Sequence, residues 1–162
     1  MSRVLILGER RNADPPNRQR QREDVDDRYW RLMSRFRAFP DESSRRRFRS
    51  IGVDLADEEE FWAMNLLMPA PQRVPWDADL AARIAKDWST RIVSVGYEIV
   101  AMCGVRVAQA FGVKSRLVDT IGEPFDVAGF RAVLLPHPSG LNRWWNSSDN
   151  IVDLKKRLER LW

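Results

Sequence analysis

The sequence has one cysteine and one histidine in 162 residues. Cys103 has no second cysteine to pair with, which excludes a disulfide within this sequence and any zinc or iron–sulfur site built from cysteines. His137 is equally isolated, so the sequence lacks the clusters of histidine and cysteine that hold most protein zinc. We therefore expect no metal site.

Long apolar runs are missing too. No run reaches the roughly 18 residues that a transmembrane helix needs. The opening residues MSRVLILGER lack the apolar region and the cleavage site of a signal peptide. Together with the lone cysteine, these absences predict a cytoplasmic protein without a membrane partner.

Three signature loops are absent as well. The sequence contains no GxxxxGKS/T phosphate-binding loop, no GxGxxG after a strand and no GxSxG turn. Their absence argues against a P-loop nucleotide hydrolase, a dinucleotide-dependent enzyme and a serine hydrolase of the α/β type.

Hydrophobic residues and arginine are what the sequence does contain. Its length and its hydrophobic content of 44% indicate one globular domain, residues 1–162, which we expect to be a monomer. Residues 1–50 carry 14 Arg against 8 acidic residues, whereas the remainder carries 13 Lys+Arg against 15. A basic half favours a polyanionic partner such as nucleic acid. Because only 4 of the 27 basic residues are lysine, a GC-rich genome explains the same excess equally well.

Apolar runs of strand length alternate with segments of helical periodicity along the chain. This alternation predicts an α/β fold, a three-layer α/β/α sandwich around a central, mostly parallel four-stranded sheet. The expected strands are residues 3–8, 60–69, 97–104 and 130–140. The expected helices are residues 24–39, 41–52, 76–88, 105–112 and 147–162, the last one capped by Ser147 or Ser148.

Polar residues and glycines stand where these four strands end. In sheets of this kind, ligands bind at the carboxyl ends of the strands. Those ends carry Gly8 to Arg10, Asn65, Gly104 and His137. We expect these positions to lie along one edge of the sheet, which makes that edge the candidate site.

The histidine at this edge is held between Pro136 and Pro138. Each proline fixes its own φ angle and lacks a backbone donor, which orients the imidazole at a low cost in entropy. An imidazole in such a place is suited to donate a hydrogen bond to a developing anion. A purely structural histidine in a tight turn is the alternative.

Two other side chains at the same edge carry useful chemistry. The amide of Asn65 offers two donors and acceptor lone pairs in one plane, which matches the edge of a nucleobase. A turn residue at a strand end is the plainer interpretation. The carboxylate of Glu9 is suited to position a water molecule, or it pairs with Arg10 or Arg11.

The loop beyond the histidine is Ser139-Gly140-Leu141-Asn142-Arg143. Its glycine allows a ligand to approach the backbone closely, and its serine and arginine suit a phosphate. Its leucine has the character of an apolar wedge that enters a base stack. The following pair, Trp144 and Trp145, is more typical of core packing than of a stacking platform.

Taken in order, these motifs resemble those of the uracil-DNA glycosylase superfamily, and most closely its iron–sulfur branch. VLILGE resembles the strand that leads to Gly-Glu in that branch. NLLMPAPQRVP resembles its Asn-Val-Val-Lys-Cys-Arg-Pro-Pro-x-Asn-Arg-x-Pro segment, matched by Asn65, Pro71, Arg73 and Pro75. IVAMCGVRVAQAFG is similar to its hydrophobic strand, glycine and Ala-rich helix. HPSGL resembles the His-Pro-Ser-x-Leu motif of several branches.

The resemblance implies hydrolysis of the bond between a base and deoxyribose, on a uracil or modified pyrimidine flipped out of DNA. It implies that Asn65 reads the base, that His137 stabilises the departing base and that Glu9 positions water or substrate. The implied partner is DNA, as flipped nucleotide and phosphate backbone, and no cofactor is needed. The implied substrate- and DNA-binding residues are Gly8, Arg10, Arg11, Asn12, Ser139, Gly140, Leu141, Asn142 and Arg143.

The sequence also departs from the branch it resembles. The four cysteines of the branch are absent, so we expect no cluster. Arg10-Arg11-Asn12 replaces its Ala-Pro-Gly, which predicts a remodelled pocket and leaves the excised base open. Two alternatives remain: a non-catalytic nucleic-acid-binding module on the same fold, and a nucleoside- or nucleotide-level enzyme of a base-modification pathway.

Overall fold

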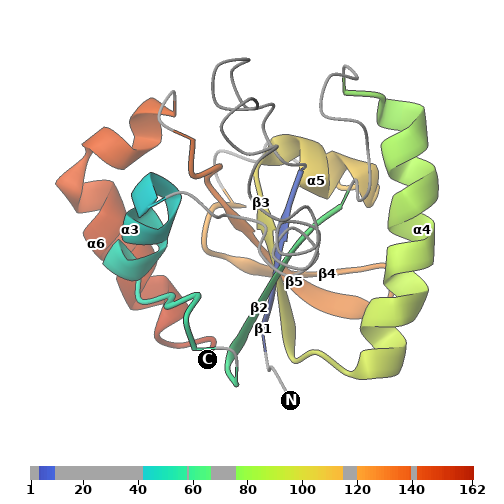
Figure 1. The fold of residues 1–162 in the computed structure, drawn as a ribbon, viewed down its shortest axis with the longest axis horizontal. Coiled ribbons are helices and arrows are strands. Elements are labelled where there is room, and N and C mark those ends of the chain that lie inside the picture. The colour runs from blue at the N-terminus through green and yellow to red at the C-terminus, as the bar shows by residue number, and fades with distance from the viewer. Residues whose placement is uncertain (1–3, 10–41, 58, 67–75, 115–119, 140–141) are drawn as a thin grey trace, which may run out of the picture.

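The computed structural model describes residues 4–9, 42–57, 59–66, 76–114, 120–139 and 142–162 (Figure 1). Its strands are β1 (Val4–Gly8), β2 (Phe61–Asn65), β3 (Ile99–Cys103), β4 (Pro124–Val127) and β5 (Phe130–Leu135). Its helices are α3 (Glu42–Ser50), α4 (Ala78–Val95), α5 (Val105–Ala110) and α6 (Ser148–Leu158), with one 3₁₀ turn, η2 (Arg143–Asn146). The predicted helix at residues 24–39 lies outside the described residues.

The strands form one sheet in the order β2-β1-β3-β5-β4. Neighbours among β2, β1, β3 and β5 run parallel, and β4 runs antiparallel to β5. The α/β class is confirmed, but the prediction of four strands is wrong, because β4 adds a fifth. It pairs with β5 through a tight turn in which Ala128 and Gly129 have φ angles of 50° and 86°, as hairpin turns of this kind require.

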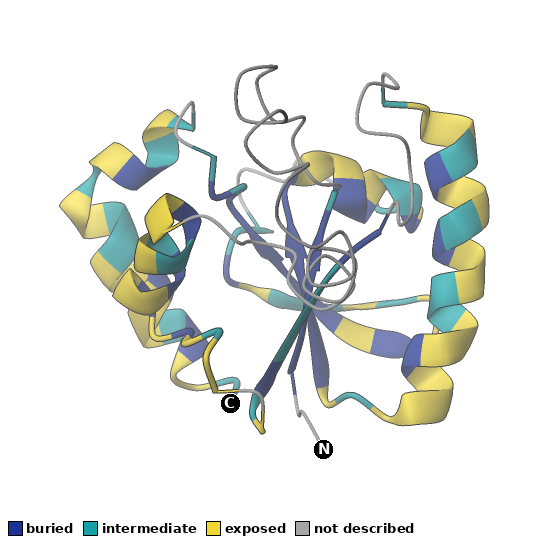
Figure 2. Ribbon diagram, viewed as in Figure 1, coloured by how far each residue is buried: buried dark blue, intermediate teal, exposed yellow. Residues whose placement is uncertain are grey.

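Helices cover both faces of this sheet, α3 and α6 on one side and α4 and α5 on the other (Figure 1). Successive side chains of a strand point to opposite faces, so β1 supplies both cores. Val4 and Ile6 join the cluster beneath α3 and α6, whereas Leu5 and Leu7 join the one beneath α4 and α5. The central strands β1 and β3 carry no polar side chain, and Figure 2 shows strands in the centre of the sheet as buried.

Helix α4 begins and ends at residues suited to those positions. The Asp77 carboxylate accepts a hydrogen bond from the backbone N–H of Leu80 at 2.9 Å, and Gly96 ends the helix in the left-handed conformation. The helix therefore runs seven residues beyond the predicted end at residue 88, up to the glycine stop. Among the described residues, no helix is long and apolar enough to cross a bilayer.

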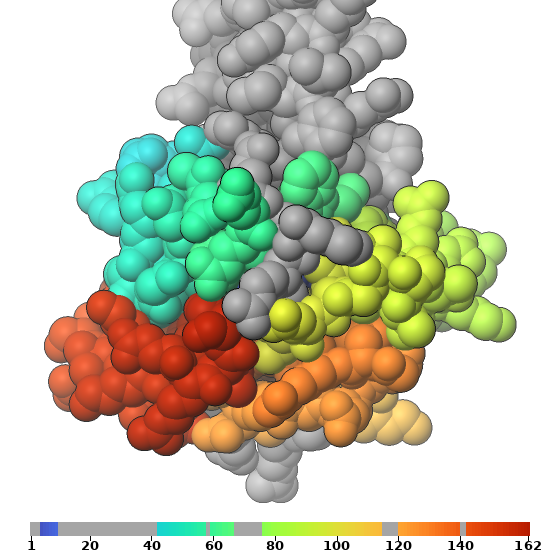
Figure 3. Space-filling model, turned by 90° about the horizontal axis from the view of Figure 1, so that it is seen from below, coloured from blue at the N-terminus to red at the C-terminus, as the bar shows by residue number. Residues whose placement is uncertain are grey.

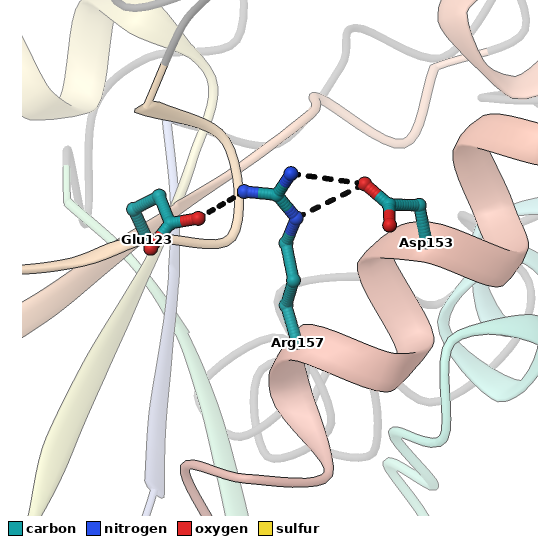
Figure 4. Close-up of polar contacts among 3 residues, drawn as sticks. All are labelled: Glu123, Asp153 and Arg157. Atoms are coloured by element: carbon teal, nitrogen blue, oxygen red, sulfur yellow. Dashed lines mark hydrogen bonds and ion pairs between the residues drawn. The ribbon is translucent and has the colours of Figure 1, made fainter.

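Helix α6 is fixed to the sheet by packing and by charge. The Ser147 hydroxyl accepts from the backbone N–H of Asn150, which confirms the predicted serine cap. Arg157 forms ion pairs with Glu123, just before β4, and with Asp153 on its own helix (Figure 4). Seen from below, the C-terminal segment lies beside the segment that contains α3 (Figure 3), and side chains of α3 and α6 pack into the same core cluster.

Candidate functional site

The carboxyl ends of the four parallel strands meet at one edge of the sheet, the upper edge in Figure 1. Gly8 is the register partner of Asn65, and the N–H of Leu66 donates to the Gly8 carbonyl oxygen at 2.8 Å. Between β3 and β5, the N–H of Gly104 donates to the Leu135 carbonyl oxygen at 2.9 Å. We call this edge, with Glu9, Asn65, Gly104 and His137, the site edge.

The imidazole of His137 has a defined tautomer. The backbone N–H of Ser139 donates to His137 Nδ1 at 3.2 Å, which makes that nitrogen an acceptor. In a neutral imidazole with an acceptor at Nδ1, the proton sits on Nε2. The ring thus presents an Nε2–H donor, and the loop itself fixes which nitrogen carries it.

Two side chains hold the backbone of this histidine from the C-terminal side. The Trp145 indole Nε1–H donates to the His137 carbonyl oxygen at 2.9 Å, and the Asn142 side-chain amide donates to the same oxygen at 3.0 Å. The Asn142 amide oxygen accepts from the backbone N–H of Trp144, and this hydrogen bond caps the N-terminus of the η2 turn. The 3₁₀ turn and the histidine are thereby joined into one unit.

Helix α3 holds the next residue of the loop. The carbonyl oxygen of Pro138 accepts from an Arg47 guanidinium nitrogen at 2.7 Å and from the Ser44 hydroxyl at 3.4 Å. Ser44 is buried. The rigidity that the flanking prolines predict is therefore reinforced by hydrogen bonds from an element more than 90 residues away in sequence.

The electrostatic surroundings favour the neutral form of this histidine. Burial lowers the pKa of His137 from its ordinary value; the Glu9 carboxylate counteracts this and the Arg106 guanidinium adds to it. The net direction is downward, because loss of hydration penalises the charged imidazolium more than Glu9 stabilises it. At neutral pH the ring is thus an uncharged hydrogen-bond donor.

Glu9 and His137 both border the space left by the missing side chain of Gly104. A Cβ placed on Gly104 would lie 3.3 Å from the His137 Cβ, 3.4 Å from its Cδ2 and 3.5 Å from Glu9 Oε1. Gly104 has φ 96° and ψ 155°, a conformation that only glycine adopts without strain. The backbone turn after β3 therefore brings the carboxylate and the imidazole around one small residue.

Arg106 completes this group from the first turn of α5. A guanidinium nitrogen lies 3.7 Å from Glu9 Oε2, and the guanidinium carbon stands 5.8 Å from the centre of the Trp76 ring. The Glu9 side chain is 17% exposed and that of Arg106 is 56% exposed. The carboxylate is thus mostly buried, whereas the arginine that pairs with it is mostly exposed.

Asn65 occupies the other end of the site edge. The residue is 2% exposed, and its amide oxygen has no hydrogen-bond partner in the part of the chain that the structure describes. A buried acceptor without a donor costs about 1–3 kcal/mol. The strand end itself is well held, since the Trp88 indole N–H donates to the Leu66 carbonyl oxygen at 3.2 Å. The position is therefore ordered and offers a lone pair for a donor.

The structure thus brings Gly8, Glu9, Asn65 and His137 to one edge. Ser139 contributes its backbone N–H, and Asn142 uses both ends of its amide within the loop. Arg143 lies exposed on η2. The remaining predicted contacts, Arg10, Arg11, Asn12, Gly140 and Leu141, lie outside the described residues.

Several residues at this site were not predicted from the sequence. Arg106 stands two positions after the glycine that ends β3, and a basic residue so close to a strand end was a usable signal. Trp76, just before α4, gave no such signal. The contacts of Ser44 and Arg47 join distant parts of the chain, so no local pattern indicates them.

Comparison with known proteins adds no family to this description. A scan against protein-family models finds no match, and a search of curated proteins finds none either. Function therefore has to be argued from the chemistry of the site edge.

Proposed function

We propose that this chain is a DNA glycosylase-like enzyme that hydrolyses the N-glycosidic bond of a flipped uracil or modified pyrimidine in DNA. The observation that carries the proposal is the buried Asn65 amide oxygen, to which none of the described residues donates, on the same sheet edge as the neutral His137. The resemblance of the motifs to the uracil-DNA glycosylase superfamily agrees with it.

Asn65 favours a base that carries an N–H next to a carbonyl. Within the described ranges nothing donates to its Oδ1, so this oxygen can accept from a base N–H while the amide nitrogen donates to a neighbouring carbonyl oxygen. A uracil-type edge offers this pair of groups. Cytosine has an acceptor at the ring nitrogen and an amino group beside it, so both contacts are mispaired while the Asn65 amide keeps this orientation. A site built to hydrogen-bond one pattern rejects the opposite pattern strongly.

His137 supplies stabilisation on the departing base. When the bond between the base and C1′ breaks, the electron pair leaves with the base, and the negative charge spreads to a ring carbonyl oxygen. The neutral ring donates its Nε2–H to that oxygen while Nδ1 keeps accepting from the Ser139 N–H, so the donor is in place before the bond breaks. One preorganised donor of this kind contributes about 3–4 kcal/mol, or roughly a hundred- to a thousandfold in rate.

Glu9 serves the sugar side of the same bond. The C1′ carbon becomes cationic as the base departs, and a carboxylate close to His137 stabilises that charge and orients a water molecule. The water oxygen bonds to C1′, and the proton that the water loses neutralises the departed base. The reaction asks only for orientation and electrostatics, so no metal or cofactor takes part.

The substrate nucleotide must leave the base stack to reach this edge. In the proposal, Leu141 fills the vacated place, and Ser139 and Arg143 contact the flanking phosphates. The arginines of the first 50 residues add affinity for the DNA backbone.

One panel of oligonucleotides tests the proposal. Duplexes and single strands that carry uracil, mismatched pyrimidines or modified pyrimidines are incubated with the protein and scored for alkali-labile abasic sites. Cleavage of a uracil-type substrate, with most activity lost in His137→Ala and Asn65→Ala variants of unchanged fold, supports it. DNA binding without abasic sites indicates the non-catalytic module, and activity on free nucleosides alone indicates the nucleoside-level enzyme.

A further inference from the structure

The two oxygens of the Glu9 carboxylate have different surroundings. Its Oε1 lies near the place where a Gly104 Cβ would stand, and His137 borders the same place. Its other oxygen, Oε2, faces the Arg106 guanidinium at 3.7 Å. One carboxylate oxygen thus borders the same space as the histidine, and the other faces the arginine.

An unrestrained carboxylate here would work against the proposed chemistry. The departing base becomes negative next to His137, and a negative oxygen that swings toward the base would repel it. The same carboxylate is useful only while it faces the sugar or a water molecule. Small displacements matter, since about 1 Å of misplacement costs on the order of a hundredfold in rate.

Arg106 has the features of a group that restrains this carboxylate. It stands on the first turn of α5, directly after the Gly104 turn, so its backbone is fixed relative to Glu9. Its guanidinium lies over the Trp76 ring, which limits where the planar group can go. The arginine is half exposed, so its role does not depend on a buried charge.

We propose that Arg106 is a positioning residue, whose guanidinium, backed by the Trp76 ring, fixes the Glu9 carboxylate beside His137. It does not touch the reacting atoms and acts only through Glu9. The consequence for catalysis rests on the proposed function, whereas the link between Arg106, Glu9 and His137 does not.

A double-mutant cycle separates action through Glu9 from an independent effect. Arg106→Gln should lower kcat by about tenfold or more with KM little changed, and Arg106→Lys should restore part of the loss. In a Glu9→Gln background, Arg106→Gln should change kcat less than about twofold, because the group it positions is already gone. Losses that simply multiply in the double variant would overturn the proposal.

The single histidine allows the same cycle without a substrate. The NMR titration of one imidazole reports on His137 alone. Glu9→Gln should lower the pKa of His137, because the carboxylate that raises it is removed. In the Arg106→Gln background this fall should be smaller, since the carboxylate is no longer held near the ring. An equal fall in both backgrounds contradicts the proposal, whatever the outcome of the oligonucleotide panel.

Two controls guard against unfolding and general charge effects. Arg83, an exposed arginine on α4, is replaced by Gln as the matched change of charge and should leave both readouts at wild-type values. Trp76→Phe keeps an aromatic ring under the guanidinium and should be milder than Trp76→Leu. If Arg83→Gln reproduces the effects of Arg106→Gln, a specific positioning role is refuted.

Discussion

The indole N–H of Trp145 donates to the carbonyl oxygen of His137 at 2.9 Å, from a side chain that is 7% exposed. The tryptophan therefore holds the backbone of the histidine and does not offer its face to a base. Its ring instead packs edge-on against Trp144, with 5.0 Å between ring centres, inside the core beneath α3 and α6. The packing role that the sequence favours for this pair thus includes a positioning role for Trp145.

Replacing Trp145 by Phe should loosen the His137 loop while it keeps an aromatic ring in the core. Loss of one buried hydrogen bond and part of the ring should lower the free energy of unfolding by about 1–2 kcal/mol, measured by urea denaturation. Trp88→Phe removes an indole bond to the Leu66 carbonyl and serves as the control. A His137 NMR signal that responds equally to both changes would contradict a specific contact.

The protonation of His137 should shape both activity and stability. The pKa of His137 lies below the ordinary 6.5, so the ring is still neutral at pH 6.5. Activity should therefore begin to decline only at a pH below 6.5. The unfolded chain binds the proton first, so the stability from the neutral ring is fully present above pH 6.5 and is lost as the pH falls toward the folded-state pKa. Unfolding curves of wild type and His137→Gln across this window measure the effect. A difference between the two proteins that does not change with pH would argue against it.

Asn65→Leu should separate stability from function. The substitution removes a buried amide oxygen without a partner among the described residues and keeps a side chain of similar shape. We expect the free energy of unfolding to rise by about 1 kcal/mol, because no polar group is then left unsatisfied. Excision of the base should be lost at the same time. A variant that loses 2 kcal/mol or more would show that the amide is bonded in the free protein.

Affinity for DNA should depend strongly on salt. If arginines neutralise phosphates, the logarithm of the binding constant falls linearly with the logarithm of salt concentration. Arg46 is exposed on α3, the helix whose Arg47 holds the Pro138 carbonyl. Arg46→Gln should therefore reduce the slope by about one, as measured by fluorescence anisotropy with a labelled duplex. An affinity that hardly responds to salt would exclude phosphate contacts by this surface.

Periodicity was sufficient for much of the fold. Runs such as residues 3–8 and 97–104 are apolar on both faces, which is typical of central parallel strands, and the structure places β1 and β3 there. Strand β4 was missed because it has four residues, begins with Pro124 and exposes Asp126. It exists because β5 offers it an edge and because the following turn is tight. Pairing with a neighbouring strand depends on the tertiary structure, so a pattern of four residues cannot predict it.

The site was predictable only in part, for a related reason. The end of a parallel strand can be read from sequence, and four strand ends implied a shared edge that holds Asn65 and His137. The groups that tune this edge come from elsewhere. Ser44 and Arg47 reach the loop through α3, and Arg106 reaches Glu9 across the Gly104 turn. Those contacts depend on how helices dock, which the hydrophobic pattern does not specify.

The conformation of Gly104 separates two kinds of evolutionary constraint at this edge. Its φ of 96° is tolerated by glycine, and a Cβ would also press on His137, so the fold as well as the chemistry restricts this position. Asn65 and His137 face no such backbone restriction, because neither is among the residues with a positive φ angle. Lineages that abandon the proposed reaction should thus drift first at Asn65 and His137 while they retain the glycine. In a related chain that keeps Gly104, Asn65 and His137, we expect the proposed reaction to be still under selection.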